Sequence, residues 1–154
     1  MARYAQNTQV SSAKSRMEIE ETLMRYGAGQ FAYGTGPDGA MIGFTMNDRQ
    51  IVFKLPMPSK DEKRFWMTPA QRRKRTPVQA YAEWEKACRQ AWRALALVIK
   101  AKLEAVESGI TEFENEFLAN IQMADGQVFG DWARPQIAQM YDQGSMPPLL
   151  GHNG

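Results

Sequence analysis

Positively charged side chains are concentrated in the middle of the sequence, in an arrangement that suits the binding of phosphate groups. Residues 60–102 contain 12 Lys and Arg against 4 Asp and Glu, a net charge of +8. Lysine and arginine attract phosphates and release their counterions, and aromatic rings in a basic groove can stack on unpaired bases. The candidate nucleic-acid-binding residues are Lys60, Lys63, Arg64, Phe65, Trp66, Arg72, Arg73, Lys74, Arg75, Lys86, Arg89 and Arg93.

These cations fall into two groups with different spacing. The run Arg72–Arg75 is consecutive, and it follows a polar stretch with Phe65 and Trp66, which look exposed. Lys86, Arg89, Arg93 and Lys100 are spaced by 3, 4 and 7 residues, so on a helix they share one side. That side lies roughly 120° from the apolar stripe and faces solvent. The alternative interpretation is a charged linker followed by a solvated helix face.

Residue types that serve catalysis are sparse in this sequence. Cys88 is the only cysteine, so neither a disulfide within the chain nor a cysteine zinc site can form, which fits a reducing, cytoplasmic setting. His152 is the only histidine, in a Gly-Pro-rich tail that holds a catalytic group poorly. The turn Gly34–Gly39 lacks the Gly-Lys-Ser/Thr of a phosphate-binding loop, so we expect a hairpin there.

The last third of the chain is acidic. Residues 103–154 carry 8 acidic groups and 1 basic group, a net charge of −7, and residues 1–59 carry a net +1. Glu112 and Glu116 have the four-residue spacing of a helical metal pair, but no histidine or second carboxylate motif accompanies them. The sequence therefore predicts neither an enzyme nor a cofactor or metal. The acidic groups could instead complement the basic middle, within one chain or between copies.

The elements that must position these residues form an α+β domain. We expect a mobile arm over residues 1–11 and a helix from about Ser12 or Ser15 to Gly27. Alternating apolar residues from Gln30 to Pro56 predict a three-stranded antiparallel meander with one apolar face. Residues 59–76 then form a long basic loop, and a loop of that length is usually functional or disordered.

A long helix should follow the basic loop. Thr76, Pro77 and Gln79 make a capping box with proline at the first helical position, and the pattern continues to Ser108 before Gly109. A second capping box at Thr111–Glu114 predicts a short helix, and Asp125-Gly126 predicts a small turn. The last helix should span about 131–143, with Ile137, Met140 and Tyr141 turned inward, followed by a tail that could dock its leucines.

The predicted organisation is a single α+β domain over residues 12–150, with residues 151–154 as a tail. Its order is an N-terminal helix, a three-stranded antiparallel meander, a long helix and two short C-terminal helices. The longest nearly apolar run, Ala94–Ile99, is too short for the ~20 residues that span a bilayer, so no membrane contact is expected. The N-terminus also lacks the apolar core of a secretory signal.

Several segments resemble a group of small uncharacterised proteins encoded by phages and prophages. They are Phe31–Gly34, Val52–Pro56, Ala87–Ile110, Phe117–Ile121 and the pair Asp125-Gly126, and the similarity covers most of residues 15–150. It implies a phage or mobile-element origin and supplies no catalytic residue. The order of helix, antiparallel strands and long helix is also similar, at the level of fold alone, to the core of phage single-strand annealing proteins.

Two functions therefore remain as hypotheses. The first is a phage-type, non-enzymatic nucleic-acid-binding protein that favours single-stranded DNA in the host cytoplasm. The second is a protein-interaction module, either an inhibitor of a host factor or a self-assembling subunit, that uses its long helix and its opposite charges.

Overall fold

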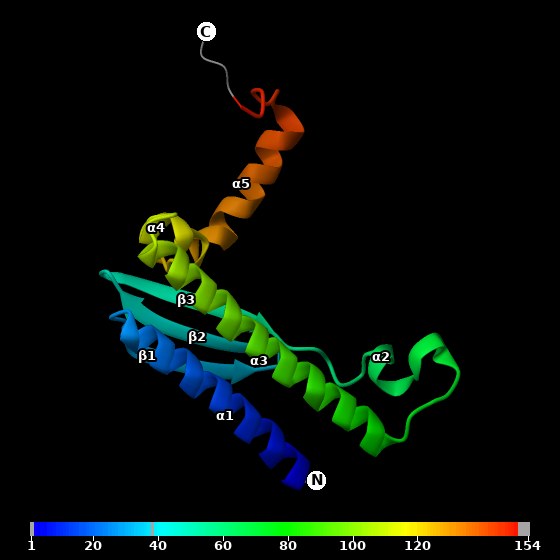
Figure 1. The fold of residues 1–154 in the computed structure, drawn as a ribbon. Coiled ribbons are helices and arrows are strands. Elements are labelled where there is room, and N and C mark those ends of the chain that lie inside the picture. The colour runs from blue at the N-terminus through cyan, green and yellow to red at the C-terminus, as the bar shows by residue number, and fades with distance from the viewer. Residues whose placement is uncertain (1, 38, 151–154) are drawn as a thin grey trace.

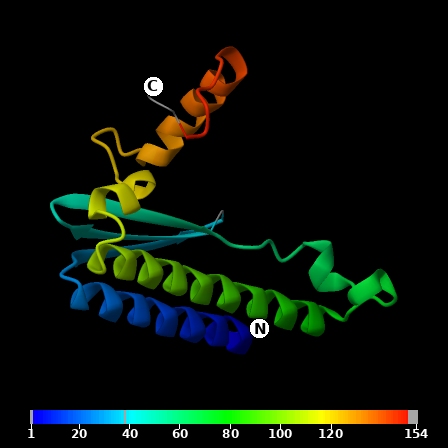
Figure 2. The same cartoon turned by 45° about the horizontal axis from the view of Figure 1, so that its top comes forward.

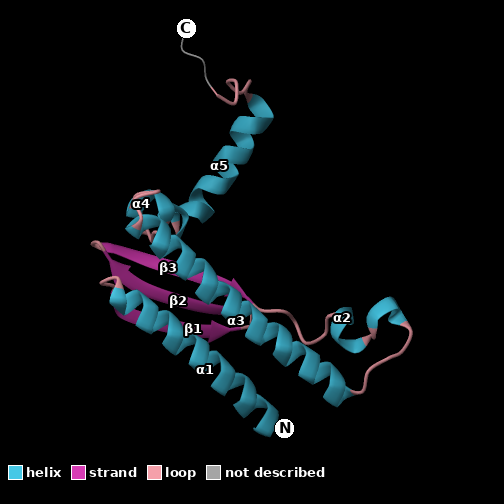
Figure 3. Cartoon of the chain, in the orientation of Figure 1, coloured by secondary structure: helices cyan, strands magenta, loops and turns pink. Residues whose placement is uncertain are grey.

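The computed structural model describes residues 2–37 and 39–150 and has the predicted α+β architecture. Two helices, α1 (Ala2–Arg25) and α3 (Pro77–Glu107), lie side by side over one face of a three-stranded sheet (Figure 1, Figure 3). The short helix α4 (Phe113–Glu116) and the 3-10 turn η2 (Leu118–Asn120) sit at one end of these layers. The last helix, α5 (Phe129–Gln143), extends away from the body in both Figure 1 and Figure 2.

The sheet is the predicted antiparallel meander, with the strand order β1-β2-β3. The strands are β1 (Gly29–Gly36), β2 (Gly39–Met46) and β3 (Arg49–Pro56). Asn47 and Asp48 both have positive φ angles, of 49° and 60°, which is the geometry of a tight hairpin turn between β2 and β3. Gly39 has φ +140°, and a Cβ there would collide with the carbonyl oxygen of Leu55. Glycine is therefore required where β2 begins.

The hydrophobic core fills the space between the helix pair and the sheet. Alternate residues of β2 are buried, as the period-two pattern predicted, because they face the helices. Phe117, which follows α4, is fully buried and meets Phe44 and Phe53 edge to face. The most deeply buried side chains are Ile19, Leu23, Ile42, Ile51, Trp92, Ile99, Leu103 and Phe117.

The N-terminal helix is longer than predicted. It begins at Ala2, so residues 2–11 of the expected arm are its first turns, and the predicted start near Ser12 is wrong. Residues 2–11 are polar and show no apolar stripe, so periodicity did not indicate a helix there. Helix propensity can still favour a helix in such a segment. The predicted tail at 151–154, with His152, lies outside the described residues.

Helix α3 agrees closely with its prediction. The Thr76 hydroxyl accepts a hydrogen bond from the Gln79 amide while the Gln79 side chain accepts from the Thr76 amide, which completes the capping box. Gly109 follows the helix with φ +79°, the left-handed geometry that ends it. Its 31 residues extend ~46 Å at 1.5 Å per residue, whereas a strand of 8 residues extends only ~27 Å. The N-terminal parts of α1 and α3 therefore overhang the sheet, as Figure 2 shows.

Of the two local features predicted after α3, the capping box is absent and the turn is present. Helix α4 has Glu112 at its N-cap without a side-chain hydrogen bond, so the capping box predicted at Thr111–Glu114 does not form. The expected turn at Asp125-Gly126 is present, and the Met123 amide donates to the Gln127 carbonyl across it.

The residues of α5 that were predicted to face inward are exposed. Ile137, Met140 and Tyr141 have exposed fractions of 49%, 57% and 67%. Leu149 and Leu150 of the tail are 99% and 87% exposed, so they do not dock. An amphipathic pattern identifies an apolar face of a helix, but it does not say whether the same chain covers that face.

Candidate nucleic-acid interface

The basic connection between the sheet and α3 is folded. It contains a one-turn helix, α2 (Lys63–Trp66), and a 3-10 turn, η1 (Pro69–Gln71). Backbone hydrogen bonds then close residues 66–75 into a hairpin: the Arg75 amide donates to the Trp66 carbonyl at 2.6 Å, and the Thr68 amide donates to the Arg73 carbonyl at 2.9 Å. We call residues 66–75 the basic hairpin. Its cations are held on an ordered scaffold.

Three cations project from the basic hairpin. Arg72, Arg73 and Lys74 are exposed, and none of them forms an ion pair with another described residue. The Arg73 amide donates to the Thr68 hydroxyl at 2.9 Å, which fixes the backbone between them. These three charges are uncompensated by described residues, and the connection that carries them leads directly into the N-terminal end of α3 (Figure 1).

Two other predicted phosphate contacts are engaged within the protein. The Arg75 guanidinium donates from Nη1 to the carbonyl oxygens of Arg64 and Phe65, at 3.0 and 3.4 Å, and so holds α2 against the hairpin. The Arg64 Nε lies 2.6 Å from a carboxylate oxygen of Glu62. Arg75 is therefore a structural residue, and the charge of Arg64 is partly compensated.

The expectation that Phe65 and Trp66 form an exposed stacking pair is wrong for Phe65. Helix α2 packs against α3, and Phe65 is 3% exposed. The next residue on a helix points in another direction, and the half-buried Trp66 donates from Nε1 to the Lys60 carbonyl at 2.9 Å. Both rings stabilise the fold of the connection.

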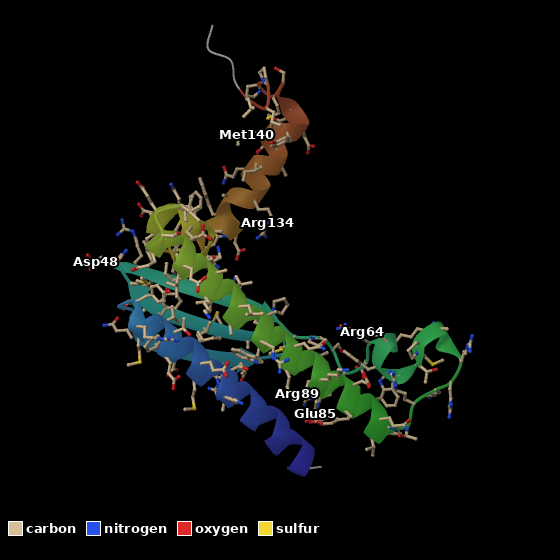
Figure 4. The ribbon with its side chains drawn as sticks, in the orientation of Figure 1. Asp48, Arg64, Glu85, Arg89, Arg134 and Met140 are labelled. Carbon is tan, nitrogen blue, oxygen red and sulfur yellow. The ribbon has the colours of Figure 1, made fainter. Side chains whose placement is uncertain are left out.

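The helical cations lead away from the basic hairpin along α3. Lys86 lies one turn from Glu83, which lines the groove beside α2. Arg93 is about 10 Å farther along the helix at 1.5 Å per residue. Arg89 lies on α3 toward α1, whereas Arg64 lies beside α2 (Figure 4). Lys86 and Arg93 are exposed, whereas Arg89 is half-buried, and Lys86 is the earliest of the three on the helix that follows the hairpin.

The acidic third of the chain does not neutralise the basic middle. Within residues 2–37 and 39–150, Lys102–Glu116 is the one ion pair that joins residues 60–102 to residues 103–150. The acidic groups Glu114 and Asp131 pair instead with Arg49 and Lys54 of the sheet, at 2.8 and 2.7 Å. The basic surface thus stays available to a partner.

A large cleft lies under the overhang of α1 and α3, at the end of the sheet. Its volume is about 950 Å³, and its lining includes aromatic side chains from the sheet and from α3. Tyr33 of β1 lies against Trp92, with ring centroids 5.6 Å apart. Trp84 precedes Trp92 on α3 by about two turns and also lines the cleft. Its Nε1 donates to the Pro58 carbonyl at 2.8 Å. We call this space the aromatic cleft.

Two cations line the aromatic cleft. The Arg16 guanidinium lies 3.7 Å from the centroid of the Tyr33 ring. The Lys60 ammonium lies 4.7 Å from the ring of Trp84 and 5.1 Å from that of Tyr81. Cations over aromatic faces are attracted by the ring quadrupole, which fixes their positions. The Nε of Arg16 is buried and has no hydrogen-bond partner among the described residues.

Cys88 also lines the aromatic cleft, but it is unsuited to nucleophilic chemistry. Burial, and secondly the charge of Glu85, raise the pKa of its thiol to about 11. The thiolate is the reactive form of cysteine, so this side chain stays protonated and inert near neutral pH.

No known protein family, curated protein or solved structure matches this chain. The resemblance to phage proteins therefore stays a prediction. In the part of the chain that the structure describes, no three His, Cys, Asp or Glu residues gather as a metal site would require. Nor does any described helix combine the length and the apolar character needed to cross a membrane.

Sequence reasoning missed the aromatic cleft. No local motif in the sequence joins Arg16, Tyr33 and Trp84 into one site. One signal was present: α3 is much longer than the strands, so side chains in its first three turns cannot all pack on the sheet. Trp84 lies in that part, and its indole instead meets the chain that leaves β3.

Proposed function

We propose that this protein binds single-stranded nucleic acid without catalysing a reaction, as a phage-type DNA-binding protein. The observation that carries the proposal is the basic hairpin, which holds Arg72, Arg73 and Lys74 exposed, ordered and free of ion pairs with described residues. Each phosphate that such a cation contacts releases a counterion, and this release favours binding. Lys60, Lys63 and Lys86 extend the same positive surface on either side.

The aromatic cleft favours single strands over duplex. Stacking on a protein ring requires a base that is not already stacked within a helix, and each such contact is worth ~1–3 kcal/mol. Lys60 belongs both to the basic connection and to the wall of the cleft. A flexible strand can follow this path from the hairpin to the aromatic rings, whereas a rigid duplex cannot bend into the cleft.

The test is fluorescence anisotropy with a labelled oligothymidine of about 20 nucleotides, long enough for one binding site. The triple variant R72A/R73A/K74A should bind more weakly, and the negative slope of log K against log salt should become shallower by about 2, because three single-strand phosphate contacts are lost. The matched control K14A/R25A/R134A removes the same charge from exposed sites elsewhere and should keep most of the affinity.

Three results would contradict this function. Absence of binding at low salt would end it. Equal losses in the two triple variants would show that net charge, and not the hairpin, drives association. Tighter binding to a duplex of the same length would contradict the preference for single strands.

A second candidate function is self-assembly. The acidic groups Glu104, Glu107, Glu112, Asp125 and Asp142 form no ion pairs with described residues, and neither do the cations of the hairpin. The basic middle of one copy and the acidic end of another are therefore complementary. Light scattering would then report a molar mass that rises with protein concentration and falls with salt. A constant monomer mass at low salt would exclude this function.

A further inference from the structure

The aromatic cleft combines two kinds of group that a single ligand class can satisfy. Its volume of about 950 Å³ is at the upper end of the ~300–1,000 Å³ that is usual for small-molecule sites. Tyr33 and Trp84 contribute aromatic rings to the cleft, and Arg16 and Lys60, which lie over these rings, contribute positive charge. A suitable ligand therefore carries both a planar ring and an anionic group.

Arg16 is the residue of the cleft that indicates most directly an anionic ligand. Its guanidinium is stacked on Tyr33 at 3.7 Å, and its buried Nε lacks an acceptor among the described residues. Buried polar groups nearly always have a hydrogen-bond partner, and an unpaired one costs ~1–3 kcal/mol. Guanidinium groups match the geometry of phosphate oxygens, and Arg16 lines the cleft, so the terminal nitrogens of its guanidinium would bind a phosphate there.

Lys60 provides a second site for the same anion. Its ammonium group is held over Trp84 and Tyr81 and forms no ion pair with a described residue. The carbonyl of Lys60 accepts from Trp66 and that of Pro58 accepts from Trp84, so two indoles fix the backbone on both sides of the cation. The acidic lining residue Asp61 forms no ion pair with Arg16 or Lys60 among the described residues.

We propose that the aromatic cleft binds one nucleotide, with its base against Tyr33 and Trp84 and its phosphate accepting hydrogen bonds from Arg16 and Lys60. The nucleotide is either a free mononucleotide or the unpaired end of a strand. The choice of a nucleotide over other anionic aromatic compounds rests on the proposed function, because Lys60 joins the cleft to the connection that carries the basic hairpin.

The experiment is titration of the full chain with adenosine 5′-monophosphate, followed by tryptophan fluorescence and calorimetry, with adenosine and inorganic phosphate as partial ligands. Stacking should quench fluorescence, and the intact nucleotide should bind at least tenfold more tightly than either part. Arg16→Met should weaken binding about tenfold or more, since a charged hydrogen bond contributes ~1.5–3 kcal/mol. The matched control Arg25→Met changes an exposed arginine of the same helix and should bind as the unchanged protein does.

Lys60→Met provides an independent variant on an exposed segment if Arg16→Met does not fold. Trp84→Leu should remove most of the quenching. Absence of binding at millimolar nucleotide would overturn the proposal. So would adenosine that binds as tightly as its monophosphate, or a Lys60→Met variant that binds like Arg25→Met, because either result would show that the cations do not hold the phosphate.

This test separates the cleft from the hairpin. If R72A/R73A/K74A loses the oligonucleotide but keeps the mononucleotide, both proposals stand. If the oligonucleotide binds and the mononucleotide does not, the cleft proposal fails and the proposed function stands. If the mononucleotide binds and the oligonucleotide does not, the proposed function fails and the cleft proposal stands. A 5′-phosphorylated oligonucleotide that displaces the mononucleotide identifies a strand end as the ligand, whereas failure to compete identifies a free nucleotide.

Discussion

The indole Nε1 of Trp84 donates a 2.8 Å hydrogen bond to the carbonyl oxygen of Pro58. This bond ties the overhanging part of α3 to the chain where it leaves β3. It also sets the position of Lys60, whose ammonium group lies over the ring of Trp84 at 4.7 Å. One side chain thus lines the aromatic cleft and contacts the cation that links the cleft to the basic connection.

Trp84→Phe should loosen this link without emptying the cleft, because a smaller aromatic ring remains while the hydrogen-bond donor is lost. The expected cost is about 1 kcal/mol, the net contribution of one hydrogen bond. Amide exchange should become faster at Glu62, whose amide donates to the Ser59 carbonyl in the same turn. Trp132→Phe is the matched control, since Trp132 is 45% exposed on α5 and should change neither quantity. Unchanged exchange at Glu62 in Trp84→Phe would mean that the indole does not hold the segment.

Arg75→Met should destabilise the basic hairpin locally. Its guanidinium donates to the carbonyls of Arg64 and Phe65, and hydrogen bonds from a charged group contribute ~1.5–3 kcal/mol. We expect faster exchange of the Thr68 amide, which bonds across the hairpin to Arg73.

Lys74→Met is the matched control for Arg75→Met, since it removes the same charge from an exposed neighbour. It should leave the exchange of Thr68 unchanged while weakening oligonucleotide binding. If both variants accelerated exchange equally, Arg75 would have no special structural role.

The contrast between Arg75 and Lys74 shows what the sequence could predict of the site. Composition and spacing identified a basic segment, and the structure brings Arg72, Arg73 and Lys74 together on one hairpin. The sequence could not distinguish Arg75 from its neighbours, because the carbonyls that it holds belong to a turn about ten residues earlier in the chain. The burial of Phe65 likewise depends on the packing of α2 against α3, a contact that local pattern does not contain.

The fold was predicted more fully than the site because its signals are local. The Thr76 capping box lies within four residues, and the alternation of β2 and β3 lies within single strands. The aromatic cleft instead needs Arg16, Tyr33, Lys60 and Trp84, which come from four separate segments. These four residues come together because α1 and α3 overhang the sheet, and the overhang exists because the helices are longer than the strands.

Because of Cys88, the stability of the folded protein should fall as the pH rises above the ordinary pKa of a thiol, 9.0. Burial raises the pKa of this thiol from 9.0 to about 11 in the folded protein. Between those two values the unfolded chain loses a proton that the folded chain keeps, so the free energy of unfolding decreases with pH. The stabilising effect of the neutral thiol is complete below pH 9.0.

The measurement is urea unfolding of the unchanged protein and of Cys88→Ala across this interval. The difference between their unfolding free energies should be constant below pH 9.0 and should shrink toward pH 11. Subtraction removes the titration of lysines and tyrosines, which both proteins share. A difference that stays constant over the whole interval would show that the thiol ionises equally in both states.

The exposed apolar residues of helix α5 lead to a prediction about stability. Ile137 and Met140 are 49% and 57% exposed, and in Figure 4 Met140 lies far from the sheet. Exposed substitutions usually change stability by less than ~0.5 kcal/mol, whereas truncating a buried leucine costs ~2–5 kcal/mol. The double variant I137K/M140K should therefore unfold as the unchanged protein does, while the control Leu103→Ala, at a position 1% exposed, should be strongly destabilised.

The same double variant distinguishes a bare helix from one that a second copy covers. If copies associate through α5, two lysines in its apolar face should lower the molar mass measured by light scattering and leave the stability of the monomer unchanged. If the unchanged protein is a monomer, mass and stability should both be the same in the variant. A loss of more than ~2 kcal/mol in a protein that is monomeric throughout would mean that α5 folds back onto the body, as the pattern of Ile137, Met140 and Tyr141 first predicted.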